Sequence, residues 1–388
     1  MNILFATTSL PHARSTGAEI ASQAFIDAMR MAGHKVHVLG FARDSSPPPP
    51  GSTAAEIRAI ETASAGWAKF GWLVGSLLRH QPYVCEKFRS QRYVDLLDQL
   101  AGDLLVIDHT QMCWLLPQWQ RWAKSLVFIA HNHEAALYAT QAKRVRNMPQ
   151  AMLLTRDSHL LRTLETQLAQ AANQIWTLSE AERSAFEAMG GHGKTSLMPL
   201  AGQPLLPATR RAEKLFDIGL LGTWSWDVNG RGLEWFVRKV LPLLPAHVSV
   251  RIAGRGSEHL PGATPNCIGL GFVPDAAGFV ASARVLAIPT ITGAGIQLKT
   301  IEAIASGTPT VSTSLGLRGL TDLPGYVAAA DTPEQFATAL MLQLHTGRQD
   351  GTAGRSWAQK RQEAFERHVA TALAKLEGWS NTAEVAVS

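Results

Sequence analysis

The sequence predicts an α/β protein with two doubly wound domains that face each other, each built on a parallel sheet. Short apolar segments recur along the chain, and the intervals between them leave room for helices. This alternation of strand and helix patterns is interrupted once, near residue 205, and then resumes. A length of 388 residues exceeds one ordinary core and suits two domains of about 190 residues each.

The first half opens with a βαβ unit. Residues 2–8 form an apolar run typical of a buried strand, residues 18–32 carry apolar side chains at helical spacing, and residues 35–41 form the next strand. Gly33 ends the helix. Such a unit implies parallel strands joined by a right-handed crossover. Further buried strands are expected at residues 104–108, 126–132 and 174–179.

The second half repeats this pattern. Two prolines interrupt residues 202–211, where no periodicity survives. We therefore expect a first domain over residues 1–203 and a second over residues 204–379, ending in a helix able to cross back to the first. Residues 380–388 are expected to be a disordered tail. The expected strands of the second domain are residues 217–223, 249–254, 268–273, 285–289 and 309–313.

Composition and charge exclude several classes of protein. The 3 cysteines are widely spaced and form no C-x-x-C, so neither a disulfide framework nor a zinc site is supported, and a cytoplasmic location is expected. We expect no signal peptide and no membrane-spanning segment, because the sequence has no long apolar run. The net charge of +5 forms no stripe of the kind that binds nucleic acid.

The strongest chemical signal is a strand, glycine turn and helix over residues 290–309. Gly293 and Gly295 let a ligand approach the free N–H groups at the start of the helix, where the helix dipole favours a phosphate. Lys299 and Glu302 share one helix face, which suits a cation near a diphosphate and a carboxylate near ribose hydroxyls. The alternative is a tight turn followed by a surface salt bridge between these two residues, and the spacing alone favours neither.

Residues 293–309 resemble the donor-binding signature of retaining GT-B glycosyltransferases of family 4, the glycosyl transferases group 1. The usual family pattern is Glu-x7-Glu. Glu302 matches the second glutamate, whereas the first, which contacts hydroxyls of the donor sugar in the family, falls on Ala294. The chain is instead similar to a branch that carries G-x-Q/R-x-K-x-x-E, here at residues 295–302.

The resemblance extends over nearly the whole chain. It implies the GT-B fold, in which two Rossmann-like domains face each other and the C-terminal domain chiefly holds the donor in the cleft. An H-N-x-E element at residues 131–134 is similar to one in the N-terminal domain of the family. The other matching segments are residues 178–182, 221–230, 252–256 and 311–320.

The resemblance also implies site residues. His131, Lys299 and Glu302 are the candidate catalytic residues. No D-x-D motif is present, so we expect neither a metal ion nor another cofactor, and helix N-termini and cations would neutralise the diphosphate. The usual Arg and Lys phosphate pair of the family is not evident around residues 223–231. The candidate donor-binding residues are Gly17, Thr223, Arg255, Gly293, Gly295, Gln297 and Thr313.

His131 also stands out from its position, because it ends a predicted strand and so lies at the carboxyl edge of a parallel sheet, where such folds bind ligands. A lone histidine is more often structural. A metal site with His133 is a further alternative, although no third ligand is suggested. His109 occupies a similar strand end and is a weaker candidate.

Two basic windows, residues 66–93 and 140–162, lie in the half expected to meet the acceptor. Residues 67–79 combine aromatic and basic side chains, which suits the surface of an anionic membrane. The alternative is a partly buried crossover helix. The windows and the resemblance favour a glycan or lipid-linked acceptor and peripheral contact with the cytoplasmic face of the inner membrane, without nucleic acid.

The expected activity is transfer of a hexose-type sugar from a nucleoside diphosphate sugar to a hydroxyl, with retention and by front-face attack, in bacterial polysaccharide or glycoconjugate biosynthesis. Alternatives are an epimerase or phosphorylase of the same fold and a non-catalytic sugar-nucleotide-binding protein. An NAD-dependent oxidoreductase is disfavoured, because no G-x-G-x-x-G follows the first strand. The sequence predicts no oligomeric state.

Overall fold

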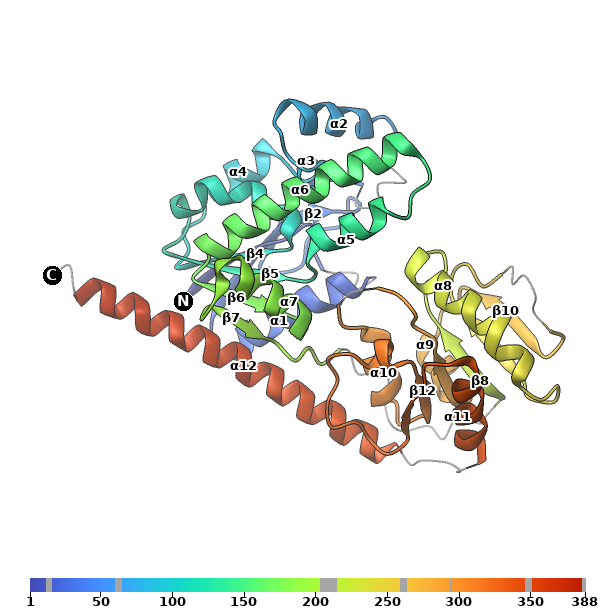
Figure 1. Ribbon diagram of the computed structural model, residues 1–388. Coiled ribbons are helices and arrows are strands. Elements are labelled where there is room, and N and C mark those ends of the chain that lie inside the picture. Colours follow the sequence, from blue (N-terminus) through green and yellow to red (C-terminus); the bar gives the residue numbers. More distant parts are fainter. Residues whose placement is uncertain are drawn as a thin grey trace. The chain divides into compact units, whose positions relative to one another are not determined.

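The computed structural model describes residues 1–11, 16–59, 65–202, 215–258, 264–293, 295–345 and 351–385. The chain forms two compact units (Figure 1). Unit 1 comprises Met1–Leu200 and Ala364–Ser388, and unit 2 comprises Ala201–Glu363. Each unit has a parallel sheet with helices on both faces, which is the predicted doubly wound architecture.

Unit 1 contains a seven-stranded sheet in the order β3-β2-β1-β4-β5-β6-β7, and every neighbouring pair is parallel. The predicted first βαβ unit is present, with its helix α1 at Gly17–Met31. β3 and β7 were not predicted. The strands are β1 (Asn2–Ala6), β2 (Lys35–Ala42), β3 (Ser52–Ile57), β4 (Leu104–Asp108), β5 (Ser125–Ala130), β6 (Gln174–Thr177) and β7 (Thr195–Leu197).

The core of unit 1 forms where helices cover the apolar central strands. Leu105, Ile107 and Phe128 are fully buried there. Cys85 and Cys113, distant in sequence, meet in this core as free thiols with sulfurs 3.4 Å apart. The helices besides α1 are α2 (Ala68–Leu78), α3 (Tyr83–Glu86), α4 (Gln91–Leu97), η2 (Thr110–Arg121), α5 (Glu134–Ala142), α6 (Met148–Ala171), α7 (Glu180–Phe186) and η3 (Glu187–Gly191).

The long helix α12 (Thr352–Val385) begins in unit 2 and ends in unit 1. Its second half completes the core of unit 1, because the ring of Phe365 lies 5.0 Å from that of Phe25 and the carbonyl of Ala372 accepts a 2.8 Å hydrogen bond from Gln174. The expected tail at residues 380–388 is corrected in part, since the helix continues to Val385. No proline or glycine follows Gly378 to stop it.

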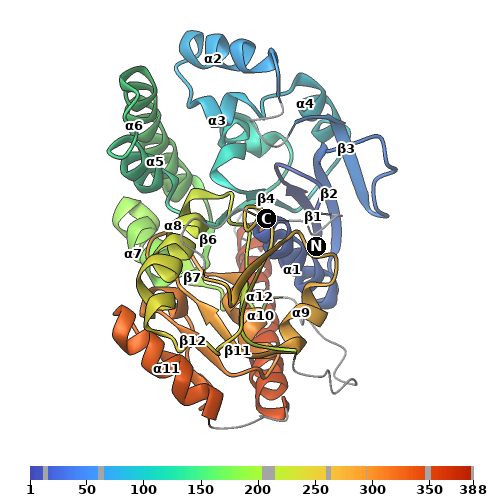
Figure 2. The same ribbon diagram turned by 90° about the vertical axis from the view of Figure 1, so that its right-hand side faces the viewer.

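Unit 2 contains a six-stranded parallel sheet in the order β10-β9-β8-β11-β12-β13. One apolar cluster joins the sheet to α8, η4 and α11, and another joins its opposite face to α9 (Figure 2). The strands are β8 (Phe216–Leu221), β9 (Val250–Ala253), β10 (Cys267–Gly271), β11 (Ala283–Ile288), β12 (Thr310–Ser312) and β13 (Val327–Ala329). The helices are α8 (Asp227–Trp235), η4 (Phe236–Val240), η5 (Leu241–Leu243), α9 (Ala276–Ser282), α10 (Leu298–Ala305), η6 (Ser314–Leu317) and α11 (Pro333–His345).

Each sheet has one point at which the strand order reverses direction. In unit 1 this point lies between β1 and β4, and in unit 2 it lies between β8 and β11. Open α/β sheets bind ligands beyond the carboxyl ends of the strands at such a point. The topology therefore marks one candidate site in each unit.

Candidate active site

The candidate residues of unit 2 gather at one edge of its sheet. Thr223 follows β8, Arg255 follows β9, Gly293 follows β11 and Thr313 follows β12. Because all these strands are parallel, their carboxyl ends lie at the same edge. The topology thus groups residues that are distant in sequence.

The glycine turn before α10 has the backbone geometry that only glycine adopts readily. Gly293 has φ 118° and Gly295 has φ 71°. A Cβ atom at Gly293 would also lie 2.8 Å from Cγ1 of Val228. The guanidinium of Arg318 donates hydrogen bonds to both carbonyls, at 2.9 Å for Gly293. Ala294, where the family pattern has its first glutamate, lies outside the described residues.

Gln297 is the residue before α10, and its side chain is fixed to the strand end. Thr290 Oγ1 donates a 2.8 Å hydrogen bond to Gln297 Oε1. This contact stabilises the turn that opens the N-terminus of α10.

Lys299 is held in the first turn of α10. Its Nζ donates a 2.9 Å hydrogen bond to Oδ1 of Asn229 and lies 5.5 Å from the ring centre of Trp224. Burial lowers the pKa of Lys299 to about 8. The ammonium is therefore a poorly solvated cation, and a nearby anion would stabilise it.

Asn229 reaches Lys299 because α8 packs closely on the end of β11. A Cβ atom at Gly232 would lie 2.0 Å from the carbonyl oxygen of Pro289, so only glycine permits this approach. The Asn229 amide also donates a 3.0 Å hydrogen bond to the carbonyl of Thr223. Asn229 thereby links the loop that follows β8 to helix α10, which follows β11 on the other side of the switch point.

Glu302 lies one turn after Lys299, and burial raises the pKa of its carboxyl to about 7. Among the described residues, no hydrogen bond or ion pair to this carboxyl group is present, and Lys299 bonds Asn229 instead. The alternative of a surface salt bridge between Lys299 and Glu302 is therefore wrong. Two partly desolvated groups of opposite charge remain on one helix face.

The other three candidates of unit 2 differ in availability. The buried Thr313 hydroxyl donates to the carbonyl of Thr290 and accepts from the amide of Gly316, so it already has structural partners. Thr223 is exposed, and so is Arg255, whose guanidinium lies 5.6 Å from the ring centre of Phe272.

In unit 1, His131 is joined to a buried carboxylate. His131 follows β5, and its Nε2 lies 2.7 Å from Oδ1 of Asp108, the last residue of β4. The other Asp108 oxygen accepts hydrogen bonds from Thr7 Oγ1 at 2.7 Å and Ser22 Oγ at 2.6 Å. These contacts lie at the switch point between β1 and β4.

His109 stacks on His131, with ring centres 3.7 Å apart. It adopts φ 77° and ψ 141°, a backbone conformation that is rare for any residue except glycine. Burial lowers the pKa of His109 to about 3, so its ring is neutral at pH 7. Burial opposes the charge on Asp108, but His109, His131 and Ser22 lower the pKa of that carboxyl below its usual range.

Asp108, His109 and His131 also form the one group of three potential metal ligands found in the described part of the chain, with ligand atoms within 4.8 Å of one another. A metal ion there would have to replace the 2.7 Å contact between His131 and Asp108. His133, the partner considered in the metal alternative, lies instead with its Nε2 3.5 Å from Oε2 of Glu165.

Gly17 opens α1, where the hydroxyl of Thr16 accepts a 3.3 Å hydrogen bond from the amide of Glu19. Gly17 is exposed, while the Glu19 carboxylate is buried and pairs with Arg43 at 2.7 Å. Residues 12–15, which precede this helix start, lie outside the described residues.

Sequence reasoning missed three residues that organise these sites, namely Asp108, Asn229 and Arg318. Asp108 ends a predicted strand, and this position at the carboxyl edge of the sheet could have marked it as a site residue. Asn229 and Arg318 lie inside the matching segments, but nothing in their spacing indicates their contacts with Lys299 and the glycine turn.

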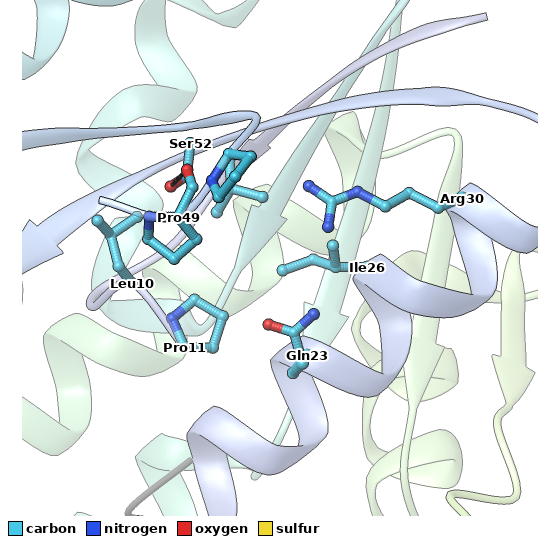
Figure 3. Close-up of a pocket in the computed structure, with 9 residues that line it drawn as sticks. Leu10, Pro11, Gln23, Ile26, Arg30, Pro49 and Ser52 are labelled. Carbon is cyan, nitrogen blue, oxygen red and sulfur yellow. Dashed lines mark hydrogen bonds between the residues drawn. The ribbon is translucent and has the colours of Figure 1, made fainter. Parts of the chain in front are cut away.

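A separate pocket of about 180 Å³ lies in unit 1 near α1, β2 and β3 (Figure 3). Leu10, Pro11, Gln23 and Arg30 contribute to its lining. None of the candidate site residues lines it, so it is distinct from both groups described above.

The family comparison and the solved structures agree with the predicted fold. Residues 216–345, within unit 2, match the family model of glycosyl transferases group 1. This match and the GT-B fold of the solved structures below confirm the predicted resemblance, and the chain has the two-domain GT-B fold. No curated protein sequence matches the chain.

Solved structures share the fold over nearly the full length at low identity. Anabaena HepE, in complex with UDP and glucose, has a TM-score of 0.62 and 15% identity over 97% of this chain and 99% of its own. WaaG, a glycosyltransferase involved in lipopolysaccharide biosynthesis, has a TM-score of 0.53 and 14% identity over 94% and 95%. A UDP-forming trehalose-phosphate synthase from Burkholderia vietnamiensis has a TM-score of 0.60 and 12% identity over 97% and 100%.

Proposed function

We propose that this protein transfers a hexose-type sugar from a nucleoside diphosphate sugar to a hydroxyl group, with retention of configuration. The observation that carries the proposal is the pair on α10. Lys299 and Glu302 are both desolvated, face one side of the helix and form no ion pair with each other. Such a pair suits a ligand that brings its own anion and its own hydroxyl donors.

Within this proposal, the diphosphate meets Lys299 and the amides at the start of α10. An anion gains from the helix dipole and from the unpaired N–H groups of the first turn. Gln297, Gly293 and Gly295 shape the backbone that presents these groups. Glu302 accepts hydrogen bonds from ribose hydroxyls, and Thr223 and Arg255 contribute at the edge of the donor site.

We further propose that His131 contacts the donor sugar and that Asp108 positions its ring. Transfer then proceeds by front-face attack, in which the acceptor oxygen bonds to the anomeric carbon as the bond to the diphosphate breaks. The acceptor proton passes to the departing diphosphate. Protein cations and helix amides stabilise the leaving group, and no metal ion is needed in this scheme.

UDP is the nucleotide we favour, because HepE is described with UDP and with UDP-glucose, and the Burkholderia synthase is UDP-forming. The acceptor is proposed to be a glycan or a lipid-linked glycan made in the bacterial cytoplasm. WaaG, which shares the fold, acts in lipopolysaccharide biosynthesis.

A thermal-shift screen against UDP-, GDP-, ADP- and TDP-sugars tests donor binding. A ligand that binds only the folded chain raises the melting temperature, and we expect this effect with UDP-sugars alone. Release of UDP with and without candidate acceptors then separates a transferase from a binding protein, and the anomeric proton coupling of the product reports retention.

Two variants test the site. Lys299→Ala and Glu302→Ala should each lower turnover by about a hundredfold, whereas Lys239→Ala, on the exposed surface of η4, should not. Full turnover in both α10 variants would refute the assignment. Formation of an epimerised nucleotide sugar or a sugar phosphate, without a glycosylated acceptor, would support the alternative activities of the same fold.

A further inference from the structure

Helix α2 of unit 1 is turned with its apolar face outward. Gly75 and Ser76 are buried against the rest of the unit, and the carbonyl of Ser76 accepts a 2.8 Å hydrogen bond from Arg156 of α6. A Cβ atom at Gly75 would lie 2.4 Å from Oε1 of Glu86, so the buried side of the helix is also its narrow side. This is the reverse of the usual surface helix, whose apolar side faces the core.

The outward face of α2 carries a continuous apolar row. Trp67 is 85% exposed and Leu78 81%, and the side chains between them follow at helical spacing. Trp67 and Phe70 lie with ring centres 5.4 Å apart. The members of the row are Trp67, Phe70, Val74, Leu77 and Leu78.

The start of α6 extends this surface, and α6 lies beside α2 (Figures 1 and 2). Arg156 holds α6 against α2. Met152 and Met148 lie one and two turns before Arg156 and are 68% and 71% exposed. Of the nine large apolar side chains exposed in the described part of unit 1, seven lie on or beside these two helices. We call these seven residues the α2/α6 surface.

Exposed basic residues adjoin the α2/α6 surface, whereas the neighbouring acidic residues Glu86 and Asp157 are buried and paired with Arg79 and Arg156. The connection between α5 and α6 carries Lys143, Arg144 and Arg146, all exposed. Residues 62–85 and 135–156 contain no aspartate or glutamate at all. A protein surface of ordinary composition carries charges of both signs, so it does not account for the basic residues alone. A lipid bilayer with anionic headgroups matches both the apolar row and the basic residues beside it.

We propose that the α2/α6 surface docks on an anionic lipid bilayer, with the apolar row in the headgroup region and the basic connection over the phosphates. Trp67 and Phe70 are suited to this depth, because aromatic rings favour the membrane–water interface. Within the described residues, no helix is both long and apolar enough to cross a membrane, so the contact is peripheral.

Cosedimentation of the full chain with extruded vesicles tests this proposal. Vesicles of phosphatidylcholine with about 30% phosphatidylglycerol should bind the chain, vesicles of phosphatidylcholine alone should bind weakly, and high salt should release it. The assay contains no nucleotide sugar, so its result is independent of the proposed transferase activity.

Two sets of variants locate the contact. The triple variant Trp67→Ser, Phe70→Ser, Leu77→Ser should weaken binding by at least about tenfold. Its control is Met31→Ser with Ile57→Ser, which removes exposed apolar side chains elsewhere in unit 1. Lys143→Gln and Arg146→Gln should each weaken binding about fivefold, whereas Lys35→Gln and Lys375→Gln should have little effect.

Three results would overturn the proposal. The first is no binding to anionic vesicles, and the second is undiminished binding by both the triple variant and the Lys143/Arg146 variants. The third is a dimer in solution that the triple variant dissociates, since the surface would then join two copies of the chain. Melting temperatures of the variants check that they fold, and the charge variants keep the test valid if the triple variant does not.

Discussion

The Nε2 atom of His131 lies 2.7 Å from Oδ1 of Asp108, a carboxylate that the fold buries completely. Because Asp108 stays ionised and can only accept, His131 must carry its proton on Nε2. The Nδ1 atom is therefore the nitrogen left for a ligand. The Asp108 carboxylate thus determines which ring nitrogen of His131 is available to a ligand.

Asp108→Asn should lower turnover by about tenfold to a thousandfold, because an asparagine side chain can donate to Nε2 and so favour the other tautomer. The hydroxyls of Thr7 and Ser22 can still donate to its oxygen, so we expect the variant to fold. The measurement is kcat together with the melting temperature. Asp95→Asn, at an exposed aspartate of α4, is the matched control.

A double-mutant cycle separates positioning from a direct role. If Asp108 acts through His131, the variant with both Asp108→Asn and His131→Ala should lose no more activity than His131→Ala alone. Additive losses would show that Asp108 acts by another route.

Glu302→Gln should stabilise the free protein at pH 8 by about 1–3 kcal/mol. Burial raises the pKa of this carboxyl to about 7, so the unfolded chain ionises first and the folded state loses stability as the pH rises from about 4.5 through 7. The substitution removes that penalty. Denaturant unfolding at pH 8 and at pH 4.5 measures it, and the gain should disappear at the lower pH. A loss of stability at pH 8 would mean that the charged carboxylate has partners in solution.

Donor binding should take up protons at pH 8 and release them at pH 7. Lys299, with a pKa of about 8, is half protonated at pH 8, and a bound diphosphate raises its pKa, so about half a proton is taken up. Glu302 is largely ionised at pH 8 but about half protonated at pH 7, where binding as the carboxylate releases protons.

Titration calorimetry in buffers of different ionisation enthalpy measures this exchange. Lys299→Met should abolish the uptake at pH 8 and Glu302→Gln the release at pH 7. Proton exchange that does not depend on either variant would exclude both residues from the donor site.

Turnover should survive dialysis against EDTA. In the proposed scheme Lys299 and the helix amides neutralise the diphosphate, and the oxygens of Asp108 already have three hydrogen-bond partners. The measurement is kcat before and after chelation, with Mg²⁺, Mn²⁺ and Zn²⁺ added back. Loss of turnover that one metal restores, and that His109→Ala also causes, would place a metal ion at the cluster of Asp108, His109 and His131.

The sequence predicts the central strands because they are buried on both faces and read as apolar runs, as at Leu104–Asp108. The edge strands β3 and β7 lack such runs, with STAAEI and TSL as their residues, and β13 is only the three residues VAA, so these strands escaped prediction. Pairing with the neighbouring strand, a tertiary interaction, places them in the sheets.

The candidate site likewise divides into features that local sequence predicts and contacts that depend on tertiary structure. Lys299 and Glu302 were predicted because their signature is local, within one helix. The contact of His131 with Asp108 depends on the register of β4 and β5, and that of Lys299 with Asn229 depends on the packing of α8. The sequence could not decide between a ligand site and a salt bridge, because burial, which made the difference, arises only in the folded unit.

Helix α12 has a consequence for biosynthesis. Phe25 and Gln174 lie in the first 200 residues, yet Phe365 and Ala372 supply their partners. During synthesis, the core of unit 1 therefore stays incomplete, with part of its apolar surface uncovered, until the segment that contains Phe365 and Ala372 has been made. Unit 2 ends at Glu363, so all of its residues are synthesised before the segment that completes the core of unit 1.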